Sequence, residues 1–85
     1  MEETVVYSFP KNQEEEVRFT LRSYKTRNYL DIRLWFQTSS EGKFYPAKKG
    51  ISLGVEFLPK LKKGIEQAVQ SARELALQPS HNPVK

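Results

Sequence analysis

The chain has 85 residues, no cysteine and a formal net charge of +4 at pH 7. This length is that of one domain, and the absence of cysteine excludes disulfides and thiolate metal sites. No apolar stretch reaches the roughly 20 residues that cross a bilayer, and the acidic start Met1-Glu2-Glu3 is unlike a secretory signal, so an intracellular protein without a membrane partner is expected.

The positive charge is concentrated in the middle third of the chain. Residues 18–49 hold eight basic and two acidic residues, a balance of +6, whereas residues 1–17 hold five Glu and one Lys, a balance of −4. Such clustering indicates a polyanionic partner.

Four strands are predicted from β-branched, aromatic and alternating segments. The first ends at Pro10, which is typical of an edge strand, and Phe44 is the clearest core residue of the last. The predicted strands are residues 4–9, 17–24, 29–37 and 43–49, and the polar connections between them are residues 11–16, 25–28 and 38–42.

A helix is predicted from about residue 55 to 78, where apolar residues recur at three- and four-residue spacings. The element order predicts the α+β class: a curved antiparallel sheet of four or five strands followed by one C-terminal helix. We expect one domain over residues 1–78 and a disordered tail over residues 79–85, which has no apolar pattern. The wide apolar stripe of the helix favours packing against a second copy, and therefore a homodimer.

The alternation in residues 17–24 and 29–37 predicts a sheet with two unlike faces. One is apolar, with Val17, Phe19, Leu21, Leu30, Ile32 and Leu34; the other is basic and aromatic, with Arg18, Arg22, Tyr24, Tyr29, Arg33 and Trp35. Basic side chains neutralise phosphates, and rings stack on unpaired bases for roughly 1–3 kcal/mol each. The pattern indicates a single-stranded nucleic acid, although each ring alone also fits a cross-strand packing pair. Asp31 interrupts the pattern and is expected to pair with Arg22 or Arg33.

Two segments resemble the transcriptional coactivator p15/PC4 family. Asp31-Ile32-Arg33 with Trp35 resembles its strand motif, D-I-R-x-x-W or D-I-R-x-W, with Trp35 at the earlier of the two Trp positions. Residues 48–53, KKGISL, resemble the segment that leads into its helix. The resemblance covers about residues 17–77. It implies a curved antiparallel sheet followed by a helix, a homodimer formed through helix and sheet, and single-stranded DNA bound with little sequence preference. It also implies the transcription machinery as a partner of eukaryotic members.

The resemblance assigns binding roles to positions that match the family pattern. The basic-x-aromatic-basic element corresponds to Arg22, Tyr24 and Lys25, and the stacking ring is Trp35 by alternation or Phe36 if a bulge intervenes. Tyr45 replaces a basic residue, and Gly54 replaces the polar residue that opens the helix. With Arg18 from the alternation, the predicted nucleic-acid-binding residues are Arg18, Arg22, Tyr24, Lys25, Arg27, Arg33, Trp35, Phe36, Tyr45, Lys48 and Lys49.

The predicted function is that of a single-stranded DNA-binding protein in transcription regulation or DNA maintenance. An RNA-binding or RNA-chaperone module is the alternative, and a protein-interaction module comes third. No metal, cofactor or catalysis is expected, because the lone His81 lies near the C-terminus and Asp31 has no neighbouring carboxylate in sequence. The sequence has no Ser- and Lys-rich regulatory tail, which favours a compact bacterial-type member. The expected location is the cytoplasm or nucleoid of a bacterium, or the nucleus of a eukaryote.

Overall fold

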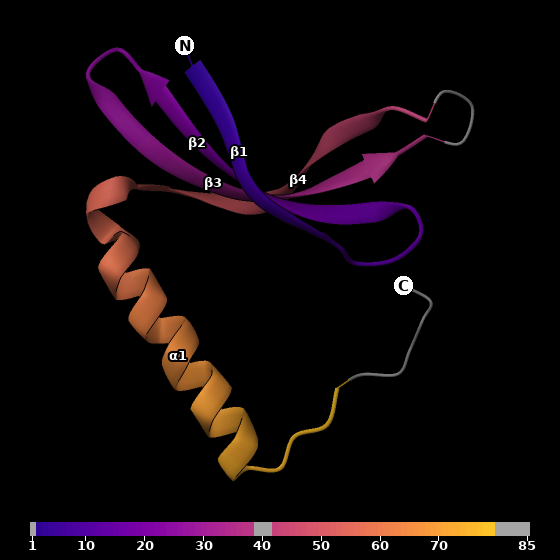
Figure 1. Cartoon of the computed structure of the whole chain (residues 1–85), viewed down its shortest axis with the longest axis vertical. Coiled ribbons are helices and arrows are strands. Elements are labelled where there is room, and N and C mark those ends of the chain that lie inside the picture. Colours follow the sequence, from indigo (N-terminus) through magenta and orange to yellow (C-terminus); the bar gives the residue numbers. More distant parts are fainter. Residues whose placement is uncertain (1, 39–41, 80–85) are drawn as a thin grey trace. The chain divides into compact units, whose positions relative to one another are not determined.

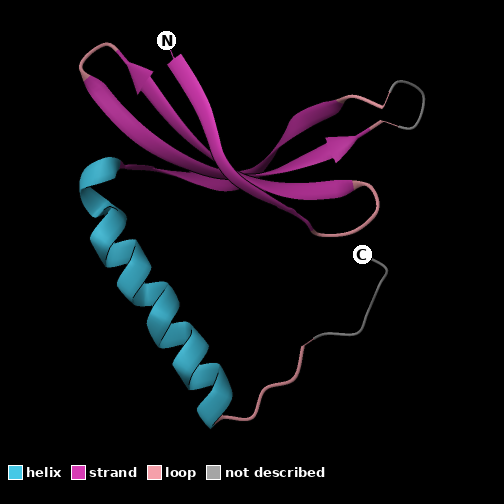
Figure 2. Ribbon diagram, viewed as in Figure 1, coloured by secondary structure: helices cyan, strands magenta, loops and turns pink. Residues whose placement is uncertain are grey.

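The chain folds as a four-stranded antiparallel sheet followed by one helix. The computed structural model describes residues 2–38 and 42–79. The elements in chain order are β1 (Glu2–Pro10), β2 (Glu15–Tyr24), β3 (Arg27–Gln37), β4 (Phe44–Gly54), the 3-10 turn η1 (Val55–Phe57) and α1 (Leu58–Glu74) (Figure 1). The strands are ordered β1-β2-β3-β4 in one strongly twisted sheet (Figure 2). The predicted α+β class is confirmed, with four strands in the described part of the chain.

The structure divides into two compact units between Val55 and Glu56. The first holds the sheet and the second holds α1. In the described residues no helix combines the length and the hydropathy that a membrane span requires.

The turn between β2 and β3 is shorter than the sequence suggests. Arg27 and Asn28 were expected in a turn, but they pair with Tyr24 and Ser23 as the first residues of β3. Only Lys25 and Thr26 remain between the strands, and Lys25 adopts a φ of 57°. A two-residue hairpin favours such left-handed backbone because its twist then matches that of the strands.

Strand β4 is longer than predicted, because it continues past Lys49 to Gly54. Ile51, Ser52 and Leu53 pair with Ile32, Asp31 and Leu30 of β3, so they are strand residues and not an approach to the helix. Helix α1 starts at Leu58 with Phe57 as its N-cap residue, and Gly54 therefore ends β4 and does not open the helix.

One face of the sheet is apolar and carries rings from two strands. Tyr7, Phe9 and Phe19 have ring centroids 5.8 to 6.3 Å apart. The residues of this apolar face, assigned from strand register and alternation, are Tyr7, Phe9, Val17, Phe19, Leu21, Leu30, Ile32, Leu34, Phe36, Tyr45, Ile51 and Leu53.

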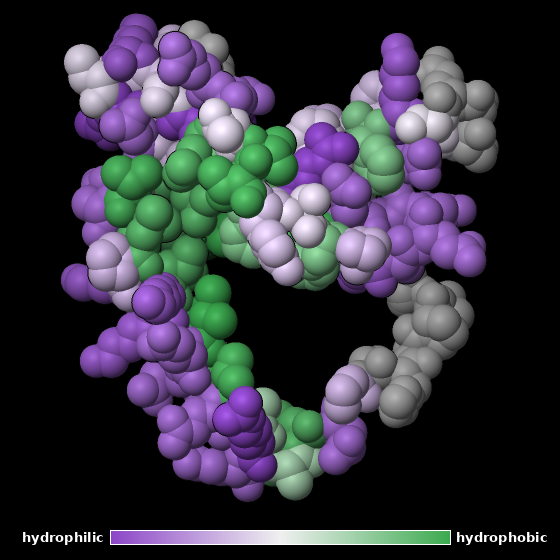
Figure 3. Space-filling view, in the orientation of Figure 1, coloured by the Kyte–Doolittle hydropathy of each residue, from purple (hydrophilic) through white to green (hydrophobic). Residues whose placement is uncertain are grey.

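The core of the isolated chain is thin. Among the described residues, Leu30 is the one buried hydrophobic side chain, at 9% exposure. Helix α1 has no buried residue, and Val69 on its apolar stripe is 49% exposed. Hydrophobic residues therefore lie at the surface of both units (Figure 3).

Candidate nucleic-acid interface

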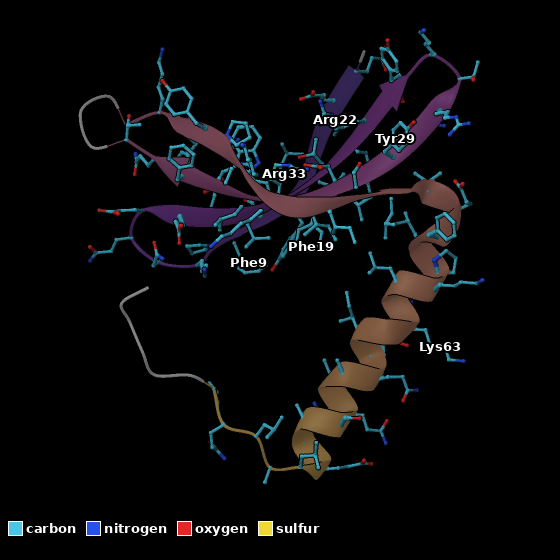
Figure 4. All side chains as sticks on the ribbon, turned by 180° about the vertical axis from the view of Figure 1, so that it is seen from behind. Phe9, Phe19, Arg22, Tyr29, Arg33 and Lys63 are labelled. Carbon is cyan, nitrogen blue, oxygen red and sulfur yellow. The ribbon has the colours of Figure 1, made fainter. Side chains whose placement is uncertain are left out.

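The basic and aromatic side chains gather on the face of the sheet opposite the apolar face. In the β2–β3 register, Arg18 lies opposite Arg33 and Arg22 lies opposite Tyr29. Residues directly opposite each other in an antiparallel pair point to the same side of the sheet. Figure 4 shows Arg22, Tyr29 and Arg33 on one side of the sheet, with Phe9 and Phe19 on the other. We call this side the basic face; it comprises Arg18, Arg22, Tyr24, Arg27, Tyr29, Arg33, Trp35 and Phe44.

The bulge that could have moved Phe36 onto the basic face lies in the other strand. Arg33 pairs with Gly50 and Trp35 pairs with Pro46, so the extra residues belong to β4 and the alternation of β3 is preserved. Trp35 therefore stays on the basic face. Phe36 lies on the apolar face, where its ring centroid is 6.1 Å from that of Tyr45.

Arg18 covers the Trp35 ring. Its guanidinium carbon lies 4.2 Å from the Trp35 ring centroid and 5.2 Å from that of Phe44, and its Nε donates a hydrogen bond to Glu16. A guanidinium at these distances is attracted by the ring faces. The expectation that Phe44 is a core residue is therefore wrong: Phe44 pairs with Gln37 on the basic face and packs under Arg18.

Arg33 links β3 to the bulged part of β4. Its Nη2 and Nε donate to the Asp31 carboxylate at 2.8 and 3.0 Å, and its Nη1 donates to the carbonyl oxygens of Ala47 and Lys48 at 3.0 and 3.3 Å. The hydrogen bond with Asp31 raises the pKa of Arg33 above its ordinary value, against the lowering effect of burial. The predicted pairing of Asp31 is confirmed with Arg33. Because Asp31 is only 3% exposed, this ion pair is part of the framework.

Gly50 is required where β4 passes close to β3. A Cβ atom at this position would lie 2.8 Å from the carbonyl oxygen of Ile32 and 3.0 Å from the Arg33 Cα. These are backbone atoms, which cannot move aside as a flexible side chain would. The glycine of the Lys-Lys-Gly segment thus has a steric role, and it keeps the bulge next to the Arg33 side chain.

An open depression of about 420 Å³ lies on the basic face. Residues of all four strands line it: Glu3, Thr20, Arg22, Asp31, Arg33, Trp35, Pro46, Ala47 and Lys48. A second one, of about 200 Å³, is lined by Arg22, Tyr24, Tyr29 and Ser52. Concave surfaces with arginines and rings offer both charge for phosphates and flat contacts for bases.

The structure places the predicted binding residues in three groups. Arg18, Arg22, Arg33, Trp35 and Lys48 lie at or beside the larger depression. The hairpin group is Tyr24, Lys25 and Arg27, which are exposed, with the Lys25 Nζ 5.3 Å from the Tyr24 ring. Lys49 is exposed in the bulge, whereas Phe36 and Tyr45 lie on the apolar face.

Two carboxylates of this face were missed from the sequence. Glu3 pairs with Arg22, with 2.9 Å between Oε2 and Nη2, and Glu16 pairs with Arg18. The alternation of β2 places Glu16 and Arg18 on one face, so the spacing of these two residues could have predicted their ion pair. In residues 2–38 and 42–79, no group of His, Cys, Asp and Glu is arranged to hold a metal ion.

Comparison with known proteins finds a matching family model and similar solved structures. The family model described as Transcriptional Coactivator p15 (PC4) matches residues 11–64, more than half of the chain. A solved PC4 homologue from Burkholderia pseudomallei is similar in its orthorhombic crystal form, with a TM-score of 0.71 and 29% identity over 78% of this chain and 88% of that one. Its tetragonal form gives a TM-score of 0.72 and 28% identity over 80% and 98% of the two chains.

A bacteriophage T5 protein shares the fold. It is described as a homologue of the eukaryotic transcription coactivator PC4 implicated in recombination-dependent DNA replication. Its TM-score is 0.64, with 21% identity over 88% of this chain and 83% of that one. A search of the curated proteins found no match.

Proposed function

The chain belongs to the transcriptional coactivator p15 (PC4) family, and from this premise we propose that it binds single-stranded DNA on its basic face with little sequence preference. The proposed setting is transcription regulation or DNA maintenance. The family binds nucleic acids and is not an enzyme family. Membership therefore supports a PC4-type DNA-binding protein, and the proposal extends this to single strands.

The observation that carries the proposal is the juxtaposition of cations and rings on one open face. Arg18 lies against Trp35, and Arg22 lies opposite Tyr29, beside a depression of about 420 Å³. Cations attract the phosphate backbone of any nucleic acid, whereas rings contribute only where bases are unstacked. A duplex hides its base faces, so it would use only half of this surface.

We also propose that the protein acts as a homodimer. The exposed apolar face of the sheet and the exposed stripe of α1 leave Leu30 as the one buried hydrophobic side chain among the described residues. Such large apolar areas on a monomer are typical of surfaces that a partner covers. A second copy is the partner that the thin core and the family membership favour.

The proposed function is tested by fluorescence anisotropy with three labelled probes: oligo-dT, an RNA of matched length and a duplex. We expect the tightest binding to oligo-dT at every salt concentration, with an affinity that falls as salt rises because counterions are released. Equal or tighter binding of the duplex would refute the single-strand proposal. Preference for the RNA probe would replace it with RNA binding.

A further inference from the structure

In the free protein, Arg18 occupies a face of the Trp35 ring that a base would use. Its guanidinium carbon is 4.2 Å from the Trp35 ring centroid, which is about the distance of a stacked group. The Arg18 and Glu16 side chains are both 23% exposed, so the pair lies at the surface where an incoming strand would reach it. A base that stacks on this side of Trp35 must therefore displace Arg18.

Each arginine in the middle of the basic face already holds a carboxylate. Arg18 pairs with Glu16, Arg22 with Glu3 and Arg33 with Asp31. These carboxylates occupy positions beside the cations that phosphates would take. The Asp31 side chain is 5% exposed and is tied to the β4 bulge through Arg33, so it belongs to the framework. The Glu16 side chain is more exposed, and its ion pair spans only two residues of β2.

We propose that Glu16 is a positioning residue that holds Arg18 over Trp35, and that nucleic acid binds by exchange. A phosphate replaces the Glu16 carboxylate as the partner of Arg18, the guanidinium leaves the ring, and a base takes its place. This inference rests on the proposed single-strand function. It makes Glu16 a residue that lowers affinity, because its ion pair has to be broken before Arg18 reaches the phosphate.

The first test uses the free protein. Trp35 is the single tryptophan of the chain, so the tryptophan fluorescence comes from this ring alone. Acrylamide quenching of its fluorescence reports how well the ring is covered. We expect Glu16→Gln to make Trp35 easier to quench, since the amide no longer fixes the guanidinium by charge. The matched control is Glu14→Gln, the same change at an exposed residue of the β1–β2 connection, which should leave quenching unchanged.

The second test is oligo-dT binding by anisotropy. Breaking a surface ion pair in advance should tighten binding of Glu16→Gln about two- to fivefold relative to wild type. Arg18 neutralises one phosphate in both proteins, so the log–log salt slope of Glu16→Gln should differ from that of wild type by less than about 0.7, the value for one phosphate on a single strand. Glu14→Gln should show less than half of this gain in affinity.

Arg18→Thr separates the ring cover from the charge. It should raise quenching as Glu16→Gln does, but it should weaken oligo-dT binding because the phosphate contact is lost. Circular dichroism checks that each variant is folded, and if Glu16→Gln fails to fold, the quenching of Arg18→Thr alone decides whether Arg18 covers the ring.

The outcomes separate this inference from the proposed function. If the wild type binds oligo-dT but Glu16→Gln binds no more tightly than Glu14→Gln and is quenched equally, the role of Glu16 is refuted and single-strand binding stands. If wild type and Glu16→Gln both fail to bind oligo-dT, the proposed function and the exchange are both refuted.

Discussion

Replacing Asp31 by Asn should strongly destabilise the sheet. Asp31 is 3% exposed and receives hydrogen bonds of 2.8 and 3.0 Å from Arg33. A hydrogen bond to a charged group contributes about 1.5–3 kcal/mol, and breaking a buried ion pair costs about 3–5 kcal/mol. The Arg33 side chain is 22% exposed, so water can partly solvate the freed guanidinium, and we expect a loss of about 2–3 kcal/mol in the free energy of unfolding.

The assay is urea unfolding followed by circular dichroism at a fixed protein concentration, because dimerisation would make stability depend on concentration. Glu66→Gln, the equivalent change at an exposed helix residue, is the control. The double variant Asp31→Asn/Arg33→Gln should lose less free energy of unfolding than the two single variants added together, because it has no unpaired charge at either position. A loss below about 0.5 kcal/mol for Asp31→Asn, the usual range of surface substitutions, would refute the framework role of this pair.

The effect of Asp31→Asn should be the same at neutral and mildly alkaline pH. The pKa of Arg33 is raised in the folded protein, so the stability that its charge contributes is complete below the ordinary pKa of an arginine and is lost only at more alkaline pH. If the destabilisation caused by Asp31→Asn became smaller from neutral to mildly alkaline pH, a group other than Arg33 would have to titrate near Asp31.

Three further predictions concern other parts of the molecule. Trp35→Ala should weaken oligo-dT binding by about 1–3 kcal/mol in anisotropy, whereas Phe36→Ala, on the opposite face, should change it far less; the reverse result would reassign the stacking ring. Gly50→Ala should lower the midpoint of urea unfolding, because its Cβ would meet β3 backbone at 2.8 Å, and Gly64→Ala, with nothing within 4 Å, should raise stability by up to about 1 kcal/mol. Equal effects of the two would contradict the steric role of Gly50. Val69→Asp, on the apolar stripe of α1, should shift a dimer towards monomer in light scattering, while Lys63→Glu should not; a monomeric wild type at micromolar concentration would refute the dimer itself.

Strand alternation predicted the two faces of the sheet because β2 and β3 pair without a register shift. From Glu15 to Tyr24, every residue of β2 lies opposite one residue of β3, so the face of each side chain follows from its position in the sequence. This regularity placed Arg18, Arg33 and Trp35 together.

The sequence was less informative where pairing and long-range contacts decide the structure. The end of β4 was missed because the segment from Gly50 to Leu53 becomes strand only by pairing with β3. Phe44 was assigned to the core because apolar character alone does not show which face a ring occupies. Some partners of the arginines lie on other strands. Arg22 pairs with Glu3 of β1, and Arg33 donates to the carbonyl oxygens of Ala47 and Lys48 on β4.

The bulge in β4 has a consequence for how the chain length can vary. Between the pairs Arg33–Gly50 and Trp35–Pro46, β3 has one residue and β4 has three, so β4 carries an excess of two. An even excess leaves the alternation in phase, and Pro46 on one side of the bulge shares a face with Gly50 on the other. If one residue were inserted or deleted here, every side chain on one side of the bulge would move to the opposite face of the sheet. In an alignment of family members, we therefore expect gaps between the positions of Tyr45 and Gly50 to come in pairs.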